Sequence, residues 1–143
     1  PEIGHRISEV LRDLRQHLKM DLVFVSEFLD GQRVFRFVEG DPALGIHVGD
    51  ASPLEASYCQ RVVQGRMPEL VQDASAVQQA LSLPPTGIPV GAHLSTPVQL
   101  SDGRVYGTLC CFSFSGNDRL TEQDLKKLRY TAKLTAAKID RAR

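Results

Sequence analysis

The residues of this sequence best suited to chemistry of their own are its three cysteines, Cys59, Cys110 and Cys111. A cysteine thiolate is a nucleophile, a redox group and a metal ligand. An odd number that includes an adjacent pair suits neither a disulfide framework nor the usual spacing of metal-ligating pairs. Neighbours on a strand point to opposite faces, so only one of Cys110 and Cys111 looks toward any one site. We expect three buried core side chains, with a redox switch between Cys59 and one of the pair as the alternative.

Other signatures of catalysis or metal binding are missing from the sequence. The four histidines follow no His-x-x-x-His spacing, and no Cys-x-x-Cys pair is present, so we predict no metal site. There is no glycine-rich phosphate loop and no Gly-x-Ser-x-Gly elbow. The sequence therefore predicts no catalytic residue and a domain that is not an enzyme. The histidines are His5, His17, His47 and His93.

The composition is that of one ordinary globular domain. The chain has 143 residues, 42% of them hydrophobic, and its 17 basic residues balance 17 acidic ones. A zero net charge gives no field that would attract nucleic acid or an anionic membrane. No apolar run reaches the roughly 20 residues that a membrane span needs, and the cysteine usage fits a reducing cytoplasm. The chain starts at Pro1 inside a helical pattern, so we expect a single domain over 1–143 that is part of a larger protein.

The first third of the chain predicts a helix followed by a hairpin. From Ile3 to about Met20 apolar residues recur every three or four positions, as on one face of a helix. Two β-rich runs follow, Leu22–Leu29 and Arg33–Val38. They flank Asp30-Gly31, and Asp-Gly suits a two-residue turn that needs positive φ at both positions.

The middle of the chain predicts an excursion of short elements. Ser52 is placed to cap a helix, with Pro53 at its first position and Gly65 as its stop. Residues 69–71 are compatible with a short strand. Asp73 is then placed to cap another short helix.

The last third predicts a second hairpin and a long closing helix. The strands are expected over Gly91–Leu100 and Arg104–Phe114. Pro97 cannot donate to a sheet ladder, which predicts an edge position or a bulge. Thr121 caps a helix that should run to about Ala142.

The order helix, hairpin, excursion, hairpin, helix defines an expected fold class. Tight turns pair strands antiparallel, and two terminal helices can cover one face of the resulting sheet. We predict an α/β fold of the α+β type, with the excursion on the other face.

Three segments resemble GAF domains, and the resemblance covers nearly the whole chain. They are Tyr58–Val63, Pro89–Leu100 and Tyr106–Phe112, which include a proline-bearing apolar strand and a Tyr-Gly-Thr-Leu strand. The sequence is similar to bacterial GAF domains found beside cyclic-di-GMP-turnover or histidine kinase modules. The resemblance implies a PAS-like antiparallel sheet of five to six strands. It also implies a small-molecule pocket roofed by residues 40–90, and terminal helices that lead to an output domain and often pair in a homodimer.

A candidate pocket follows from this resemblance and from strand alternation. His93 shares a face with Ser95, and Tyr106 is expected on one face with Thr108, Cys110 and Phe112. Polar groups in an apolar wall are typical of small-ligand sites. For His93, a histidine that is partly exposed or satisfied by the backbone is the competing interpretation. The candidate ligand-binding residues are Tyr58, Cys59, Asp73, His93, Ser95, Tyr106, Thr108 and Cys110.

The ligand is not named by the sequence, although two classes are disfavoured. Photosensory GAF domains usually have histidine after the bilin-bearing cysteine, whereas Gln60 follows Cys59 here. Cyclic-nucleotide GAF domains carry an Asn-Lys-Phe-Asp-Glu motif, and the only asparagine here is Asn117. The cofactor stays unknown.

The sequence leaves three functions open. The first is a cytoplasmic sensory domain that passes ligand state to an output domain. The second is a cysteine-based redox enzyme or switch resembling free methionine sulfoxide reductase. The third is a dimerisation scaffold with a filled pocket. An apolar stripe on the closing helix predicts either a coiled-coil seam or contact with the domain's own sheet. It contains Leu125, Leu128, Ala132, Thr135, Ile139 and Ala142.

Overall fold

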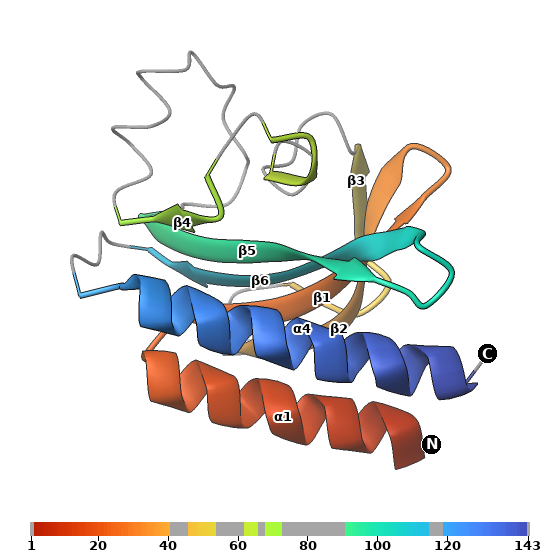
Figure 1. Cartoon of the computed structure of the whole chain (residues 1–143), viewed down its shortest axis with the longest axis horizontal. Helices are drawn as coiled ribbons and strands as arrows, with labels where there is room; N and C mark the ends of the chain where they lie inside the picture. The colour runs from red at the N-terminus through yellow and green to blue at the C-terminus, as the bar shows by residue number, and fades with distance from the viewer. Residues whose placement is uncertain are drawn as a thin grey trace.

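The protein is an antiparallel sheet with two long helices on one face, as a computed structural model shows (Figure 1). The structure describes residues 2–40, 46–53, 62–65, 68–72, 91–114 and 119–142. Tyr58, Cys59 and Asp73 of the candidate pocket lie outside these ranges. None of the described helices is long and apolar enough to cross a membrane.

Both helices begin and end close to the predicted residues. Helix α1 spans Glu2–Leu18 and helix α4 spans Glu122–Ala142. At the start of α4 the Thr121 hydroxyl accepts from the Asp124 backbone N–H at 3.4 Å, and the Asp124 carboxylate accepts from the Thr121 N–H at 3.0 Å. This reciprocal pair is a capping box, and it confirms Thr121 as the predicted helix cap.

The described residues form a sheet of six strands in the order β3-β2-β1-β6-β5-β4, and every neighbouring pair is antiparallel. The central pair β1–β6 joins the two predicted hairpins. The α+β fold class predicted from the sequence, an antiparallel sheet with the terminal helices on one face, is confirmed. The strands are β1 (Leu22–Leu29), β2 (Gln32–Gly40), β3 (Ala51–Pro53), β4 (Leu70–Val71), β5 (Ala92–Gln99) and β6 (Val105–Ser113).

The tight turn between β1 and β2 has the predicted geometry. Asp30 has φ of 52° and Gly31 has φ of 75°. Two central residues with positive φ form the turn type whose twist matches antiparallel strands. The Asp-Gly pair therefore fixes the register of the hairpin.

The predicted helix start at Ser52 is wrong. Ser52 and Pro53 lie in strand β3, where they pair with Arg33 and Gln32 of β2. A capping sequence is a local signal, and pairing with a strand some twenty residues away overrides it. Pro53 is tolerated because β3 is at the edge of the sheet. Residues 54–61 of this predicted helix lie outside the described residues. Its predicted end is confirmed, because residues 62–63 are helical and Gly65 has a positive φ of 74°.

Pro97 occupies the edge position that its chemistry requires. The short strand β4 pairs with β5 only at Leu94 and His93, and the Ser95 N–H donates to the Glu69 carbonyl. Beyond Ser95 the strand β5 runs along a side that β4 does not cover. A residue without an N–H costs no ladder bond there.

Two side-chain clusters fill the two faces of the sheet. On the helix side, α1 and α4 cover Val23 and Val25 of β1 and Leu109 and Cys111 of β6. The opposite side holds a smaller, mainly aromatic cluster of Leu22, Phe24, Phe35, Cys110 and Phe112.

The apolar stripe of α4 faces its own domain. Leu125, Leu128 and Ala132 belong to the helix-side cluster, and Thr135 is 1% exposed. Of the two interpretations open from the sequence, the structure therefore supports contact with the sheet, and this stripe is not available as a coiled-coil seam.

Candidate functional site

A row of hydrogen-bonded polar side chains crosses three strands on the face away from the helices. The Ser26 and Thr108 hydroxyls lie 2.9 Å apart, the Cys110 thiol donates to Thr108 Oγ1 at 3.2 Å, and Ser95 Oγ lies 3.0 Å from Cys110 Sγ. These four residues are at most 1% exposed. Three of them, Ser95, Thr108 and Cys110, are candidate ligand-binding residues, and the structure brings them together. We call Ser26, Ser95, Thr108 and Cys110 the polar row.

The geometry of the polar row gives one of its bonds a direction. Because the Cys110 thiol uses its single hydrogen to donate to Thr108, the Ser95 hydroxyl donates to the Cys110 sulfur, whereas either hydroxyl can be the donor between Ser26 and Thr108. A buried hydroxyl without a partner costs about 1–3 kcal/mol, so the row is stable only while each member bonds to the next. A ligand that exchanges bonds with one member therefore affects the others.

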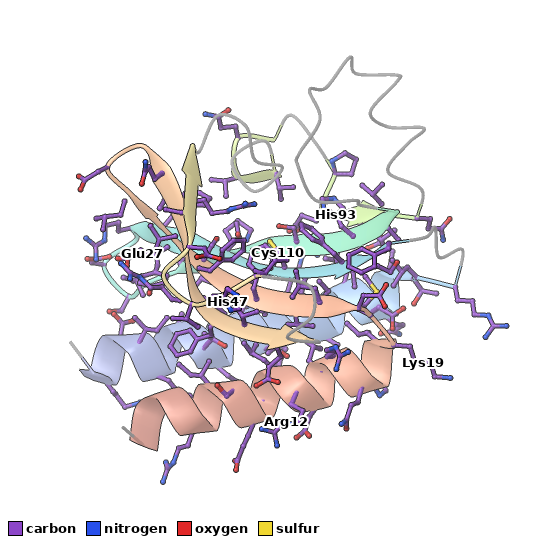
Figure 2. All side chains as sticks on the ribbon, turned by 180° about the vertical axis from the view of Figure 1, so that it is seen from behind. Arg12, Lys19, Glu27, His47, His93 and Cys110 are labelled. Atoms are coloured by element: carbon purple, nitrogen blue, oxygen red, sulfur yellow. The ribbon has the colours of Figure 1, made fainter. Side chains whose placement is uncertain are left out.

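His93 lies on the same face beside the row, as Figure 2 shows for His93 and Cys110. Its Nε2 is 3.3 Å from the Pro68 carbonyl oxygen, so Nε2 carries the proton of the neutral ring. The ring stacks on Phe112 at 6.1 Å between centroids. Complete burial lowers the pKa of His93 to about 4, against a smaller opposing effect of the Pro68 bond. His93 is therefore a neutral hydrogen-bond donor at pH 7.

Arg33 is a site residue that the sequence analysis missed. Its guanidinium lies over the rings of Phe35 and Phe24, at 4.7 and 5.7 Å from their centroids, and the residue is 7% exposed. Phe24 also packs edge-on against Phe112. Stacking on aromatic faces is a favourable setting for a guanidinium. The available signal was the alternation of β2, which puts Arg33 on the face of Phe35.

Tyr106 does not share the face of Thr108 and Cys110, so this part of the prediction is wrong. The pairing of β5 with β6 shifts between Val98 and Gln99, and Tyr106 is the extra residue. A bulge of this kind reverses the alternation. Tyr106 packs against the helix-side cluster, where burial and then the nearby Glu27 raise its pKa, against smaller effects of Arg36.

The adjacent cysteines occupy different environments. Cys110 belongs to the polar row, whereas Cys111 lies in the helix-side cluster and is fully buried. Desolvation raises the pKa of Cys111 far above its ordinary value. A thiol that stays protonated is a poor nucleophile, so Cys111 is a core residue. The sequence prediction that only one of the pair faces a given site is confirmed.

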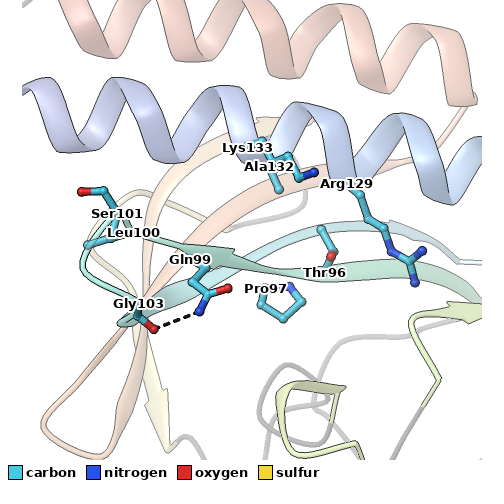
Figure 3. Close-up of a pocket in the computed structure, with 9 residues that line it drawn as sticks. All are labelled: Thr96, Pro97, Gln99, Leu100, Ser101, Gly103, Arg129, Ala132 and Lys133. Carbon is cyan, nitrogen blue, oxygen red and sulfur yellow. Dashed lines mark hydrogen bonds between the residues drawn. The ribbon is translucent and has the colours of Figure 1, made fainter.

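A separate groove of about 600 Å³ lies on the helix side, between β5 and α4 (Figure 3). The groove follows the outer edge of β5, and its lining residue Pro97 pairs across the sheet with Thr108 of the polar row. The Glu69 carboxylate accepts hydrogen bonds from two of its lining residues, Thr96 at 3.1 Å and Arg129 at 3.0 Å. Its lining residues are Thr96, Pro97, Gln99, Leu100, Ser101, Gly103, Arg129, Ala132 and Lys133.

Metal ligands are not grouped in the part of the chain that the structure describes. No three histidine, cysteine, aspartate or glutamate side chains there are placed to hold one ion. The chemistry of the described site is thus hydrogen bonding, aromatic stacking and one buried guanidinium.

These features define the class of the protein: an α+β domain with helices on one face of its sheet and a buried polar site on the other. The chain belongs to the GAF domain family, whose model matches residues 5–140. A search of curated proteins finds no match.

Solved structures support the same fold. The GAF domain of an Acinetobacter phosphoenolpyruvate-protein phosphotransferase superposes with a TM-score of 0.77 at 17% identity, covering 98% of this chain and 83% of that one. The GAF-B domain of DevS from Mycobacterium smegmatis gives 0.71 at 17% identity, with 97% and 94% covered. A type II free methionine-R-sulfoxide reductase from Thermoplasma acidophilum gives 0.75 at 14% identity, with 96% and 92% covered.

Proposed function

We propose that this GAF domain is a sensory module of a cytoplasmic bacterial signalling protein. It binds a small molecule on the face formed by β1, β5 and β6, and α1 and α4 pass the ligand state to an output domain. A histidine kinase or a cyclic-di-GMP-turnover domain is the output that we propose, in a homodimer formed through the terminal helices.

The observation that carries this proposal is the contrast between the two faces of the sheet. The helix-side cluster on β1 and β6 is apolar, whereas the polar row crosses the same strands on the other face. Buried polar groups are costly, and packing alone gives no reason to place four of them together. Donors and acceptors beside aromatic walls are what small-ligand sites use.

Contacts between this face and the helices support the proposed transmission. Leu109 and Cys111, the sequence neighbours of Cys110, pack on the helix side. The turn between β5 and β6 contacts the end of α4, where the Ser101 N–H donates to the Asp140 carboxylate at 3.0 Å. The first residues of α1 and the last of α4 lie at the same end of the domain (Figure 1). A ligand that favours one position of β6 therefore acts on α4 near that end, as allosteric coupling requires.

Native mass spectrometry of the purified domain, beside a denatured control, tests the proposal. We expect extra mass that is lost on denaturation, and its value gives the class of ligand. Thr108→Val removes a member of the polar row and should reduce the bound fraction. Thr131→Val is the matched control, because Thr131 is also a buried threonine but bonds to the Lys127 carbonyl within α4.

Three results decide this experiment. Ligand loss in Thr108→Val but not in Thr131→Val supports the site on the polar row. Equal loss in both variants, or in neither, contradicts it. An empty protein that also binds nothing from a metabolite extract would favour the scaffold function.

A redox enzyme is the second candidate, and the position of Cys110 favours it. Cys110 faces the site and accepts a hydrogen bond from Ser95. A similar fold occurs in the free methionine-R-sulfoxide reductase. The test is turnover of free methionine-R-sulfoxide with a dithiol reductant, compared with Cys59→Ser and Cys110→Ser. Turnover lost in either variant would support the enzyme, and no turnover in the parent protein would exclude this substrate.

A further inference from the structure

Arg33 brings a permanent positive charge to the face of the sheet that carries the polar row. It lies in β2, and its guanidinium stacks over the rings of Phe35 and Phe24, at 4.7 and 5.7 Å from their centroids. In the sheet Phe35 pairs with Ser26, and Phe24 pairs with Cys110. Directly paired residues have their side chains on the same face. The guanidinium therefore lies on rings that are immediate neighbours of two members of the polar row.

The charge of Arg33 is largely shielded from water. The residue is 7% exposed, and a guanidinium cannot be deprotonated in a protein. The polar row contributes hydroxyls and a thiol, and His93 is a neutral donor, so these residues supply no negative charge. A low local dielectric strengthens the attraction between a guanidinium and an anion. An anionic group that enters this part of the site is therefore favoured over a neutral or cationic one.

The polar row adds a hydrogen-bond donor of its own. Its four members carry one hydrogen each, but three hydrogen bonds join them, so one hydrogen is left over. The hydrogens of Ser95 and Cys110 are used inside the row, which leaves the spare hydrogen on Ser26 or Thr108. Neither of these two hydroxyls has a hydrogen-bond partner outside the row among the described residues. A buried donor without an acceptor is unfavourable, so a ligand that supplies an acceptor is stabilised there.

The two kinds of donor border the same space. The ring of Phe35 carries the guanidinium, and Phe35 is the direct cross-strand neighbour of Ser26 at the end of the row. Arg33 takes part in another interaction as well, and the five N–H donors of a guanidinium serve several acceptors at once. This part of the site thus offers donors and one positive charge, and its natural complement is a group that has acceptors and one negative charge.

We propose that the ligand of this site is a small organic acid whose carboxylate binds the Arg33 guanidinium and accepts the spare hydrogen of the polar row. This inference rests on the proposed sensory function and names the chemical class of its ligand. The two oxygens of a carboxylate match two parallel N–H groups of a guanidinium, and its single charge balances the single charge of Arg33. A phosphate monoester would bring more negative charge than one guanidinium offsets.

Benzoate and benzamide are the probes that test the ligand class. They have nearly the same shape, but benzoate is an anion at pH 7 and benzamide is neutral. Isothermal titration calorimetry on the dialysed protein should show benzoate binding at least about tenfold more tightly, because hydrogen bonds from a charged donor to a charged acceptor are stronger than those to a neutral amide. Equal binding of the two probes, or no binding of benzoate, would overturn the proposal.

Substitution of Arg33 tests where this preference comes from. Arg33→Met keeps an unbranched stem on the rings and removes the charge, so it should abolish the preference for benzoate. Arg36→Met is the matched control, because Arg36 is an arginine of the same strand that pairs with Glu27 at 2.8 Å. It should leave the preference unchanged. A preference that persists in Arg33→Met, or that is lost equally in both variants, would overturn the proposal.

Isotope labelling of the arginine nitrogens gives a readout that does not depend on the folding of Arg33→Met. The Nε–H signal of Arg33 in the NMR spectrum of the parent protein, assigned with Arg33→Lys, should shift when benzoate is added and stay in place with benzamide. The signal of Arg36 should move with neither probe. An Arg33 signal that does not move at saturating benzoate would place the anion elsewhere and overturn the proposal.

The identity of the native ligand separates this inference from the proposed function. A bound compound without a carboxylate would overturn the inference and leave the sensory function standing. Benzoate binding through Arg33, in a protein that retains nothing from a metabolite extract, would support the inference and contradict the sensory function.

Discussion

Replacing His93 with glutamine should reduce the loss of folding stability that this domain shows as the pH falls from 6.5 to about 4. The imidazole is completely buried, and its pKa is lowered from 6.5 to about 4, chiefly by desolvation. In the unfolded chain the ring takes up a proton near pH 6.5, whereas the folded state resists protonation until about pH 4. The unfolded state therefore binds more protons between these values, and stability falls as the pH falls through that range.

The size of the effect follows from the same pKa difference. One pKa unit corresponds to about 1.4 kcal/mol, so the difference between 6.5 and 4 corresponds to about 3 kcal/mol. This contribution is complete above pH 6.5 and is lost as the pH approaches 4. A domain of this size is stable by about 5–15 kcal/mol in total, so the change is large enough to measure.

The assay is urea unfolding of the parent protein and of His93→Gln at pH values between 4 and 8. Glutamine keeps a donor for the Pro68 carbonyl but does not titrate. Carboxylates shared by both proteins cancel in the difference between their free energies of unfolding. That difference should change by about 3 kcal/mol, with the parent protein losing more stability on acidification.

A matched control and a refuting result complete the experiment. His17 is an exposed histidine on α1, and His17→Gln, measured in the same way, controls for the replacement of a histidine outside the core. A difference curve for His93→Gln that is flat between pH 6.5 and 4 would show that the buried ring titrates as freely as in the unfolded chain. That result would refute the description of His93 as a desolvated neutral donor.

Three other substitutions test the structure in different places. Gly107→Ala should destabilise the domain by about 2–4 kcal/mol in urea unfolding, because a Cβ there would overlap the backbone carbonyl of Ser26 on the central pair of strands. A cost below about 0.5 kcal/mol would contradict this close approach. Thr108→Val should cost about 1–3 kcal/mol in the same assay, because it leaves buried partners of its hydroxyl unsatisfied. Stability equal to the parent protein would argue against the polar row. Glu69→Gln should cost at most about 1 kcal/mol and less at high salt, because Arg129 is half exposed in their ion pair; a salt-independent cost would contradict an electrostatic origin.

Elements with a local cause were predictable from the sequence. The turn at Asp30-Gly31 follows from the need for positive φ, and the start of α4 follows from the reciprocal bonds of Thr121 and Asp124. Pro97 indicated an edge because a missing N–H limits where a strand can pair. Each of these signals lies within a few residues of its effect.

Features that depend on distant partners were not predictable. The local sequence around Ser52 predicts a helix cap, but the pairing of Ser52 with Arg33 makes it part of a strand. Strand alternation predicts Tyr106 on the face of Thr108 and Cys110. Because Tyr106 is the extra residue of the bulge in the pairing with β5, its side chain lies on the helix side instead. The stacking of Arg33 on Phe24 joins two strands whose faces the sequence did not assign.

The candidate site was predicted in part, and for a physical reason. Alternation along β5 and β6 is regular near Ser95 and Cys110, so their common face could be inferred. Which face the helices cover depends on the packing of α1 and α4, which a single strand does not encode. Ser26 joins the row only because β1 pairs with β6, a contact between residues 82 positions apart.

The alternation of β5 and β6 also has a consequence for protein engineering. The side chains of Ser95 and Cys110 lie in the polar row, while those of Leu94 and Leu109 lie in the helix-side cluster. In the proposed function, ligand specificity and coupling to the helices would therefore depend on interleaved but separate sets of positions. A library that varies only the odd positions of β5 and the even positions of β6 near the row can retune what the domain recognises. The residues that pack against α1 and α4 would not change in such a library. A new ligand specificity could then be selected without altering the contacts between the sheet and the helices.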